Sequence, residues 1–261
     1  MTLKSSKVYC KNSTTVFEPL TPSVFEPVDL NIIKLFSINI EDYLSYLNYF
    51  SSVISKTELA RSDKFFNSND KNNYIISHGI LRIILSQYLG ITPKEIQYTF
   101  NENKKPSLIL ETPFFNISHS KNCTILGFSN EVIGVDVEFV PKESNNAITL
   151  KSILHPVEID FIKNSNSPEK EFFKIWTRKE AVFKCLGSGI PDIPSQLACI
   201  DGENIWNHNL SNNQKTFYIQ SFQLEANYKC AVASSSLAYP KVKLIDPESL
   251  KTVIKSIIQT F

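Results

Sequence analysis

The chain has 261 residues, a length that suits one large domain or two small ones. Its apolar fraction of 42% and charged fraction of 20% are those of an ordinary globular protein with a sizeable core. The net charge of +1 excludes a global field that would attract nucleic acid or a membrane surface. We therefore expect neither partner, and any anion site must be local.

The five cysteines argue against an extracellular disulfide framework. They are scattered and odd in number, and none forms a CxxC pair, so neither a disulfide set nor a zinc site is predicted. The N-terminal stretch contains no apolar signal-peptide core, and no later segment approaches the length of a membrane span. We expect a cytoplasmic protein.

The hydrophobic pattern first predicts an arm, then helices, then strands. Residues 1–30 contain prolines and the tetrapeptide VFEP twice, which favours an extended arm laid over the body. Residues 40–89 have apolar side chains at helical spacing and end at Gly90. Strand-like pieces follow at 95–100, 113–120, 122–129 and 131–140.

The order of helices and then strands repeats in the rest of the chain. Helical patterns cover 152–164 and 172–184, strand patterns cover 196–202, 217–225 and 228–236, and an amphipathic helix covers 247–259. This order predicts two similar α+β halves that meet near residue 130. The predicted divisions are an arm (1–30), a first half (31–130), a second half (131–240) and a helical tail (241–261).

Two acids interrupt the otherwise apolar strand IGVDVEFV. Asp136 and Glu138 are two residues apart, so they project from the same face, where they repel each other and lose hydration. A cation is the natural compensation, and Mg²⁺ prefers such oxygen ligands. The alternative is a half-buried edge strand whose polar side chains face water.

The stretch FFKIWTRKEAVFK (172–184) combines aromatic side chains with charge. Trp176, Glu180 and Lys184 lie at i, i+4 and i+8, so they share one face of the predicted helix. Phosphate chemistry needs acids that bind a metal and a cation that reaches the same phosphates. The alternative is an exposed pair between Glu180 and Lys184, worth about 0.3–0.5 kcal/mol.

A third stretch, 101–123, offers groups that bind anions. Lys104 and Lys105 precede Pro106, and a strand ends near Asn116. We predict that Ser118-His119-Ser120 forms a turn that opens a short helix, whose hydroxyls, imidazole and free N–H groups bind an anion. The alternative is a turn histidine bonded to nearby backbone. The sequence lacks the GxSxG, GxxxxGK(S/T) and GxGxxG motifs.

Taken in order, these motifs resemble those of the 4′-phosphopantetheinyl transferases of the surfactin-synthetase-activating (Sfp-like) type. That family pairs an (I/V)G(I/V)D strand with a W(S/T)xKEAxxK helix, and the chain has Ile133–Asp136 and Trp176–Lys184. Lys105-Pro106 and Phe115–Ser120 match further motifs in the same order. The resemblance extends from about Thr57 to Ala233.

The resemblance implies a fold and a reaction. The fold is an α+β pseudo-dimer with coenzyme A in the cleft between its halves, and a monomer is expected because both halves lie in one chain. A serine of an apo acyl or peptidyl carrier protein attacks the β-phosphate of coenzyme A and releases 3′,5′-ADP. The alternative is a catalytically weak or inactive paralogue that only binds coenzyme A or a carrier.

The resemblance also implies roles for individual residues. Asp136, Glu138 and Glu180 would hold Mg²⁺, or Mn²⁺, on the pyrophosphate, and Lys184 would reach the same phosphates. The catalytic base would be Glu180 or Glu158. The residues implied for coenzyme A are Arg61, Lys104, Lys105, Pro106, Asn116, Ser118, His119 and Lys184.

Two positions depart from the family pattern. Glu58 and Asn73 fall near places where a cation is common, while Arg61 fills one such place. The grip on the 3′-phosphate is therefore expected to be either weaker than in the family or shared with lysines, namely Lys56, Lys64 and Lys71.

A carrier-docking patch is the last expectation. Ile148, Leu150 and Ile153 would meet the carrier's acidic helix, with Lys142 and Lys151 beside them. The alternative is ordinary core packing of a short helix.

Overall fold

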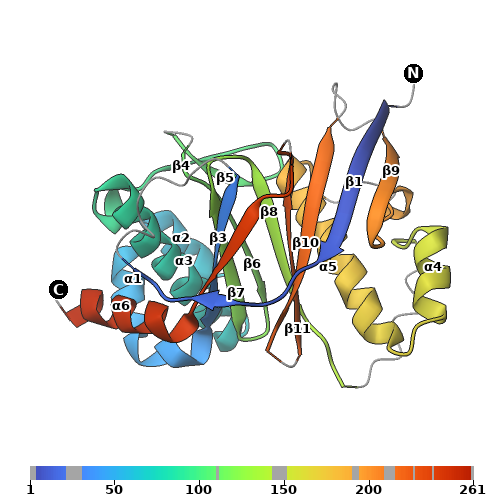
Figure 1. Cartoon of the computed structure of the whole chain (residues 1–261). Coiled ribbons are helices and arrows are strands. Elements are labelled where there is room, and N and C mark those ends of the chain that lie inside the picture. Colours follow the sequence, from blue (N-terminus) through green and yellow to red (C-terminus); the bar gives the residue numbers. More distant parts are fainter. Residues whose placement is uncertain are drawn as a thin grey trace.

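The protein is built around two five-stranded mixed sheets whose edges meet (Figure 1). The computed structural model describes residues 4–21, 31–109, 112–142, 152–189, 194–208, 215–225, 227–236 and 238–259. Helices and strands are both abundant, and the expected α+β class is confirmed. Within these described ranges, no helix is long and apolar enough to cross a membrane.

The first sheet has the strand order β2-β12-β3-β7-β6. Its strands are β2 (Phe17–Glu18), β12 (Lys241–Ile245), β3 (Ile32–Asn39), β7 (Cys123–Ser129) and β6 (Phe114–Ser120). Helices lie on its outer side in Figure 1, namely α1 (Leu47–Val53), α2 (Lys56–Ser62), α3 (Ser68–Leu89) and α6 (Pro247–Gln259). As predicted, α3 ends at Gly90, whose φ of 64° is the left-handed conformation of a helix C-cap.

The second sheet has the order β8-β11-β10-β1-β9. Its strands are β8 (Ile133–Phe139), β11 (Tyr228–Ser234), β10 (Thr216–Leu224), β1 (Lys4–Asn12) and β9 (Gly202–His208). The long helix α5 (Pro168–Leu186) crosses its outer face, and α4 (Pro156–Lys163) packs beside α5. Side chains of α5, β1, β10 and β11 form the core of this half.

Short elements lie between the longer helices and strands. The β4–β5 hairpin (Tyr98–Phe100 and Pro106–Leu108) forms a small sheet of its own. The 3₁₀ turns are η2 (Ile40–Tyr46), η3 (Pro93–Glu95) and η4 (Pro194–Gln196).

Both ends of the chain contribute strands, where the sequence predicted an arm and a helical tail. Within residues 1–30, β1 pairs parallel with β10 and antiparallel with β9, so it lies inside the second sheet. Within residues 241–261, β12 pairs with β3 of the first sheet before α6 begins. These partners lie far away in the sequence, so the local pattern contains no sign of the pairing.

The predicted strand at 196–202 is wrong. Irregular backbone follows η4, and the strand β9 begins only at Gly202. The carbonyls of this segment accept hydrogen bonds from buried side chains of α5: Lys179 Nζ donates to Leu197 O (2.5 Å) and Arg178 Nη1 to Cys199 O (2.8 Å). These bonds satisfy groups that a strand would otherwise pair.

The helix α5 lies directly on the backbone of β8 because Gly134 has no side chain. A Cβ at Gly134 would lie 2.0 Å from Ala181 O and 2.3 Å from Cys185 N. Both are backbone atoms in a close-packed interior, so neither moves aside alone. The glycine of the IGVD motif therefore allows the helix that carries Glu180 to lie against the strand that carries Asp136.

We predict that Gly134→Ala lowers the free energy of unfolding by about 3 kcal/mol, the upper end for an overpacked core, because the obstacle is backbone. Gly90→Ala is the control, since its Cβ would meet nothing within 4 Å and only its left-handed φ is unfavourable, at about 1–2 kcal/mol. Denaturant unfolding measures both. A Gly134→Ala protein as stable as the Gly90→Ala protein would contradict the close approach.

Candidate active site

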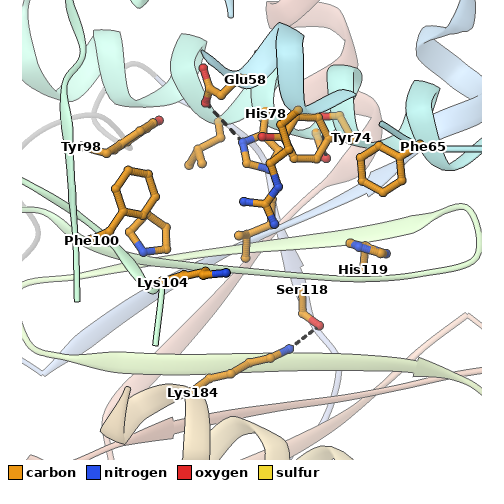
Figure 2. Close-up of a pocket in the computed structure, with 15 residues that line it drawn as sticks. Glu58, Phe65, Tyr74, His78, Tyr98, Phe100, Lys104, Ser118, His119 and Lys184 are labelled. Atoms are coloured by element: carbon orange, nitrogen blue, oxygen red, sulfur yellow. Dashed lines mark hydrogen bonds and ion pairs between the residues drawn. The ribbon is translucent and has the colours of Figure 1, made fainter. Parts of the chain in front are cut away.

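A cavity of about 450 Å³ lies on the first half and reaches the second half at Lys184. Its lining comes from α2 and α3, the β4–β5 hairpin, β6 and α5, and includes Glu58, Arg61, Tyr74, His78, Tyr98, Phe100, Lys104, Pro106, Ser118, His119 and Lys184. Figure 2 shows Glu58 and His78 along one side and Ser118 and Lys184 along the other. A second cavity of about 280 Å³ shares Lys104 and Lys184 with the first and reaches Glu180.

Asp136 and Lys184 form an ion pair at the boundary of the two cavities. Lys184 Nζ lies 2.6 Å from Asp136 Oδ1 and donates to Ser118 Oγ at 2.8 Å. Asp136 is 3% exposed, and this burial raises the pKa of its carboxyl group, although the Lys184 charge opposes the rise. The structure therefore brings together the strand acid and the helix lysine that the sequence singled out.

Glu138 and Glu180 complete a group of three carboxyl groups that influence one another. Burial and the neighbouring Asp136 raise the pKa of Glu138, against hydrogen bonds from Ser120 and Trp176. Burial, then repulsion by Asp136, raises the pKa of Glu180 to about 7. These acids are not the solvated surface groups that the alternative interpretations required.

A ladder of side chains joins the edge strands β6 and β8 and holds the acids. Asn116 Oδ1 accepts from Val135 N (2.8 Å), and Ser118 Oγ and Ser120 Oγ accept from the N–H groups of the next alternate residues of β8. The same hydroxyls donate to the acids, Ser118 to Asp136 (2.8 Å) and Ser120 to Glu138 (2.9 Å). The motif Asn116-x-Ser118-x-Ser120 therefore connects the two halves and orients their acids.

The predicted helix after His119 is wrong. Residues 114–120 are all strand, and the backbone of Ser118 to Ser120 pairs with β7 instead of forming a turn that opens a helix. The turn follows at Lys121, whose φ is 51°. The side chain of His119 lines the cavity. Because no helix begins here, the imidazole, and not free helix N–H groups, is what His119 offers to an anion.

A charged cluster of α2 and α3 forms the far wall of the cavity. Arg82 Nε donates to Glu58 Oε2 at 2.7 Å, His78 Nδ1 lies 3.3 Å from Glu58 Oε1, and the Arg61 guanidinium lies 5.6 Å from the Tyr74 ring centroid. Arg82 thus balances the acid at Glu58. The sequence analysis missed this residue, although Tyr74, His78 and Arg82 recur every four residues along α3 and form one polar row.

Asn73, the other departure from the family pattern, has a structural contact. Its Nδ2 donates to Lys121 O at 2.8 Å, which ties α3 to the β6–β7 turn.

The structure does not bring Glu158 to the cavity. Glu158 and Lys179 are both 0% exposed, and Lys179 Nζ lies 2.8 Å from Glu158 Oε2. Glu158 also accepts from His155 N and Cys199 N, each at 2.7 Å. Both of its oxygens are used in holding α4 and the 194–201 segment against α5.

The residues expected to dock a carrier are only partly described. Ile148, Leu150 and Lys151 lie outside the described residues. Ile153 is half-buried and packs against Leu154, Ile162 and Phe172 of the core beside α4, as the core-packing alternative requires.

The donor chemistry of the three acids fits a divalent cation. Asp136 Oδ2 and Glu180 Oε1 are buried without a hydrogen-bond partner, a state that costs free energy unless something binds them. Carboxylate oxygens are the ligands that Mg²⁺ prefers. In the part of the chain that the structure describes, no three acidic, histidine or cysteine side chains are already gathered around one metal position. Lys184 supplies the positive charge beside Asp136 instead.

The fold and the site define a two-half α+β protein with acids and a lysine at the junction of its halves. Two family models match the chain: the 4′-phosphopantetheinyl transferase superfamily at residues 132–233, and the N-terminal part of 4′-phosphopantetheinyl transferases at residues 43–130.

Curated relatives agree with these matches. The chain is 30% identical over 162 residues to a putative 4′-phosphopantetheinyl transferase of Synechocystis, which covers 60% of the chain and 65% of the relative. It is 30% identical over 165 residues to HetI of Nostoc, covering 60% and 70%, and over 190 residues to gsp of Aneurinibacillus migulanus, covering 72% and 78%; both carry the name 4′-phosphopantetheinyl transferase. The chain belongs to the 4′-phosphopantetheinyl transferase superfamily, a group of transferase enzymes, and the predicted resemblance is confirmed.

The Glu58–Arg82 pair generates a prediction about acid stability. Burial by itself would raise the pKa of Glu58, but hydrogen bonds from His78 and Ser55 and the Arg82 charge outweigh it and lower the pKa to about 2. A lowered folded-state pKa stabilises the protein above the ordinary carboxyl range, and this stabilisation is lost as the pH falls toward 2. We predict that the free energy of unfolding of Glu58→Gln is about 2 kcal/mol below that of wild type at pH 7. This difference is expected to become smaller as the pH falls from 5 to 3. Urea unfolding at several pH values measures this difference. A difference that does not change with pH would contradict the lowered pKa of Glu58.

Proposed function

We propose that the protein transfers the 4′-phosphopantetheine group of coenzyme A to a serine of an apo carrier protein, an acyl or peptidyl carrier, and releases 3′,5′-ADP. The observation that supports this proposal is the meeting of Asp136, Glu138 and Glu180 with Lys184 beside the second cavity, which Glu180 and Lys184 line, in a chain of this superfamily. Both walls of the cavity come from one chain, which supports a monomeric enzyme.

The transfer breaks one phosphorus–oxygen bond and forms another. The serine Oγ attacks the β-phosphorus of coenzyme A, and the oxygen that bridges to the α-phosphorus leaves with 3′,5′-ADP. Negative charge grows on the transferred phosphoryl group and on the leaving phosphate. Lys184 lines both cavities and would donate to these oxygens, which exchanges its present partners for phosphate.

A divalent ion, Mg²⁺ or Mn²⁺, would add positive charge beside the pyrophosphate, held by Asp136, Glu138 and Glu180. The support is the pair of buried, unpartnered oxygens on Asp136 and Glu180. Ser118 and Ser120 keep the strand acids in place by the hydrogen bonds of the β6–β8 ladder. Repulsion among the three acids makes a bound cation more favourable than at an isolated carboxylate.

The nucleotide would occupy the larger cavity. Arg61, Lys104 and His119 line it and carry the groups suited to phosphates, while Pro106 and the rings of Tyr98 and Phe100 offer apolar surface. We assign coenzyme A to this cavity, with its pyrophosphate toward Lys184.

The attacking serine must lose its proton, so a base is needed beside the cavities. Glu180 is the candidate, because it faces the second cavity and its Oε1 has no partner. Glu158 does not qualify, since it is fully buried with both oxygens bonded.

Mass measurement of a carrier protein tests the proposal. Incubated with apo acyl or peptidyl carrier, coenzyme A and Mg²⁺, the protein is expected to add one phosphopantetheine to the carrier. Glu180→Gln is expected to slow this transfer about 100-fold or more, because it removes a charge needed in the transition state. No mass gain across several carriers, with coenzyme A still bound, would favour the inactive paralogue.

Glu158→Gln is the matched control, since it makes the same chemical change at a residue that lines neither of the two cavities. We expect it to lower stability by about 3 kcal/mol, because Lys179 keeps a buried charge without its partner. The transfer rate of the folded protein is expected to stay within about threefold of wild type, an effect of at most about 0.7 kcal/mol on the barrier. Loss of transfer in Glu158→Gln but not in Glu180→Gln would reverse the assignment of the base.

A further inference from the structure

The β4–β5 hairpin has contacts with the larger cavity and with the end of α5. Phe100, Lys104 and Pro106 line the larger cavity. Asn101 and Lys105, by contrast, reach across to the C-terminal end of α5 in the other half of the molecule. One short hairpin therefore touches both the ligand cavity and the helix that carries Glu180 and Lys184.

The contacts at the end of α5 are side-chain hydrogen bonds to carbonyls of its last turn and of its C-cap residue, Gly187. Asn101 Nδ2 and Asn103 Nδ2 both donate to Gly187 O, at 2.8 and 3.0 Å, and Lys105 Nζ donates to Lys184 O at 2.6 Å. The last four carbonyls of a helix have no partner within it, so these donors fill an existing need. Gly187 leaves room for them, because a Cβ there would lie 2.8 Å from Asn101 Nδ2.

The ammonium group of Lys105 is fully used by backbone. Besides Lys184 O, it donates to Ile133 O at 3.0 Å and Cys185 O at 3.5 Å, and a lysine has three donors. Its place in the family motif implied a contact with the nucleotide, yet all three donors point at carbonyls. Lys104, the preceding residue, is exposed and lines both cavities.

The carbonyls that Lys105 joins belong to the two elements that carry the site. Ile133 O lies on β8, three residues before Asp136, and Lys184 O belongs to the residue whose Nζ contacts Asp136. A shift of α5 along β8 would therefore break the Lys105 bonds. Within the second half, Gly134 allows close approach of the two elements, and the hairpin of the first half fixes where α5 ends.

We propose that Asn101, Asn103 and Lys105 form a clamp of positioning residues that holds the end of α5, and so places Lys184 and Glu180 relative to Asp136. Asn103 and Lys105 also line the second cavity, but the Lys105 ammonium group points at carbonyls, so we assign the clamp its effect through the position of α5. This inference depends on the proposed function for its kinetic readout only.

Lys105→Met tests the clamp, with Lys104→Met as the matched control. If Lys105 positions Lys184, kcat falls about tenfold or more, since misplacement of about 1 Å can cost 100-fold. The affinity for 3′,5′-ADP, measured by calorimetry, stays within about twofold. Lys104→Met is expected to weaken 3′,5′-ADP binding about tenfold, the loss of one charged hydrogen bond. Weakened 3′,5′-ADP binding in Lys105→Met with unchanged kcat at saturating coenzyme A would overturn the proposal.

A second variant covers the case in which Lys105→Met fails to fold. Asn101 and Asn103 are exposed, so the double substitution Asn101→Ala/Asn103→Ala removes both bonds to Gly187 O, and the Lys105 N to Asn101 Oδ1 bond within the hairpin, without opening the core. We expect a lower kcat, unchanged 3′,5′-ADP binding and faster amide hydrogen exchange in the last turn of α5. Unchanged kcat together with unchanged exchange would overturn the clamp.

Hydrogen exchange separates this proposal from the proposed function. If wild-type protein transfers nothing to any carrier, the function fails, and exchange at the end of α5 still decides the clamp. Faster exchange in the variants than in wild type and Lys104→Met supports it, and equal exchange rejects it.

Discussion

The close approach of α5 to β8 at Gly134 is the constraint on which the rest of the site depends. Any side chain there would collide with the backbone at Ala181 and Cys185, so the helix and the strand touch only because the residue is glycine. Asp136 follows two residues later, and it meets Lys184 from the next turn of the helix. The acids and the lysine thus gather because two backbones pack in direct contact, and the β6–β8 ladder and the hairpin hold that arrangement from the other half.

Negative charge is incompletely balanced at this site. The three carboxyl groups lie together and are buried or half-buried. Among the residues that the structure describes, Lys184 is the cation that pairs with one of them, and Asp136 Oδ2 and Glu180 Oε1 are buried without a partner. This excess of negative charge favours the binding of a cation, alone or together with a ligand that carries it. The cations elsewhere in the second half have other roles: Arg178 and Lys179 are 0% exposed and bond the 194–201 segment, which supports α5 from its far side.

The sequence predicted the parts of the site that are local. Asp136 with Glu138, and Glu180 with Lys184, were found because strand and helix periodicity place each pair on one face. Partnerships across the chain were not predictable in this way. Arg82 forms an ion pair with Glu58 from another helix, and Lys179 forms one with the buried Glu158. The strand β1 pairs with β10, which lies far away in the sequence. At His119 the error was local: Ser118 and Ser120 suggested a turn, but their hydroxyls bind a neighbouring strand, so the strand continues.

The central claim is that Asp136, Glu138 and Glu180 hold a divalent ion together with the pyrophosphate of coenzyme A. Titration of the protein with Mn²⁺, followed by electron paramagnetic resonance with and without coenzyme A, measures this directly. The account predicts that coenzyme A promotes the binding of a single Mn²⁺ ion, and that Asp136→Asn abolishes this binding while coenzyme A still enters the larger cavity. Equal Mn²⁺ binding by wild type and Asp136→Asn in the presence of coenzyme A would contradict it.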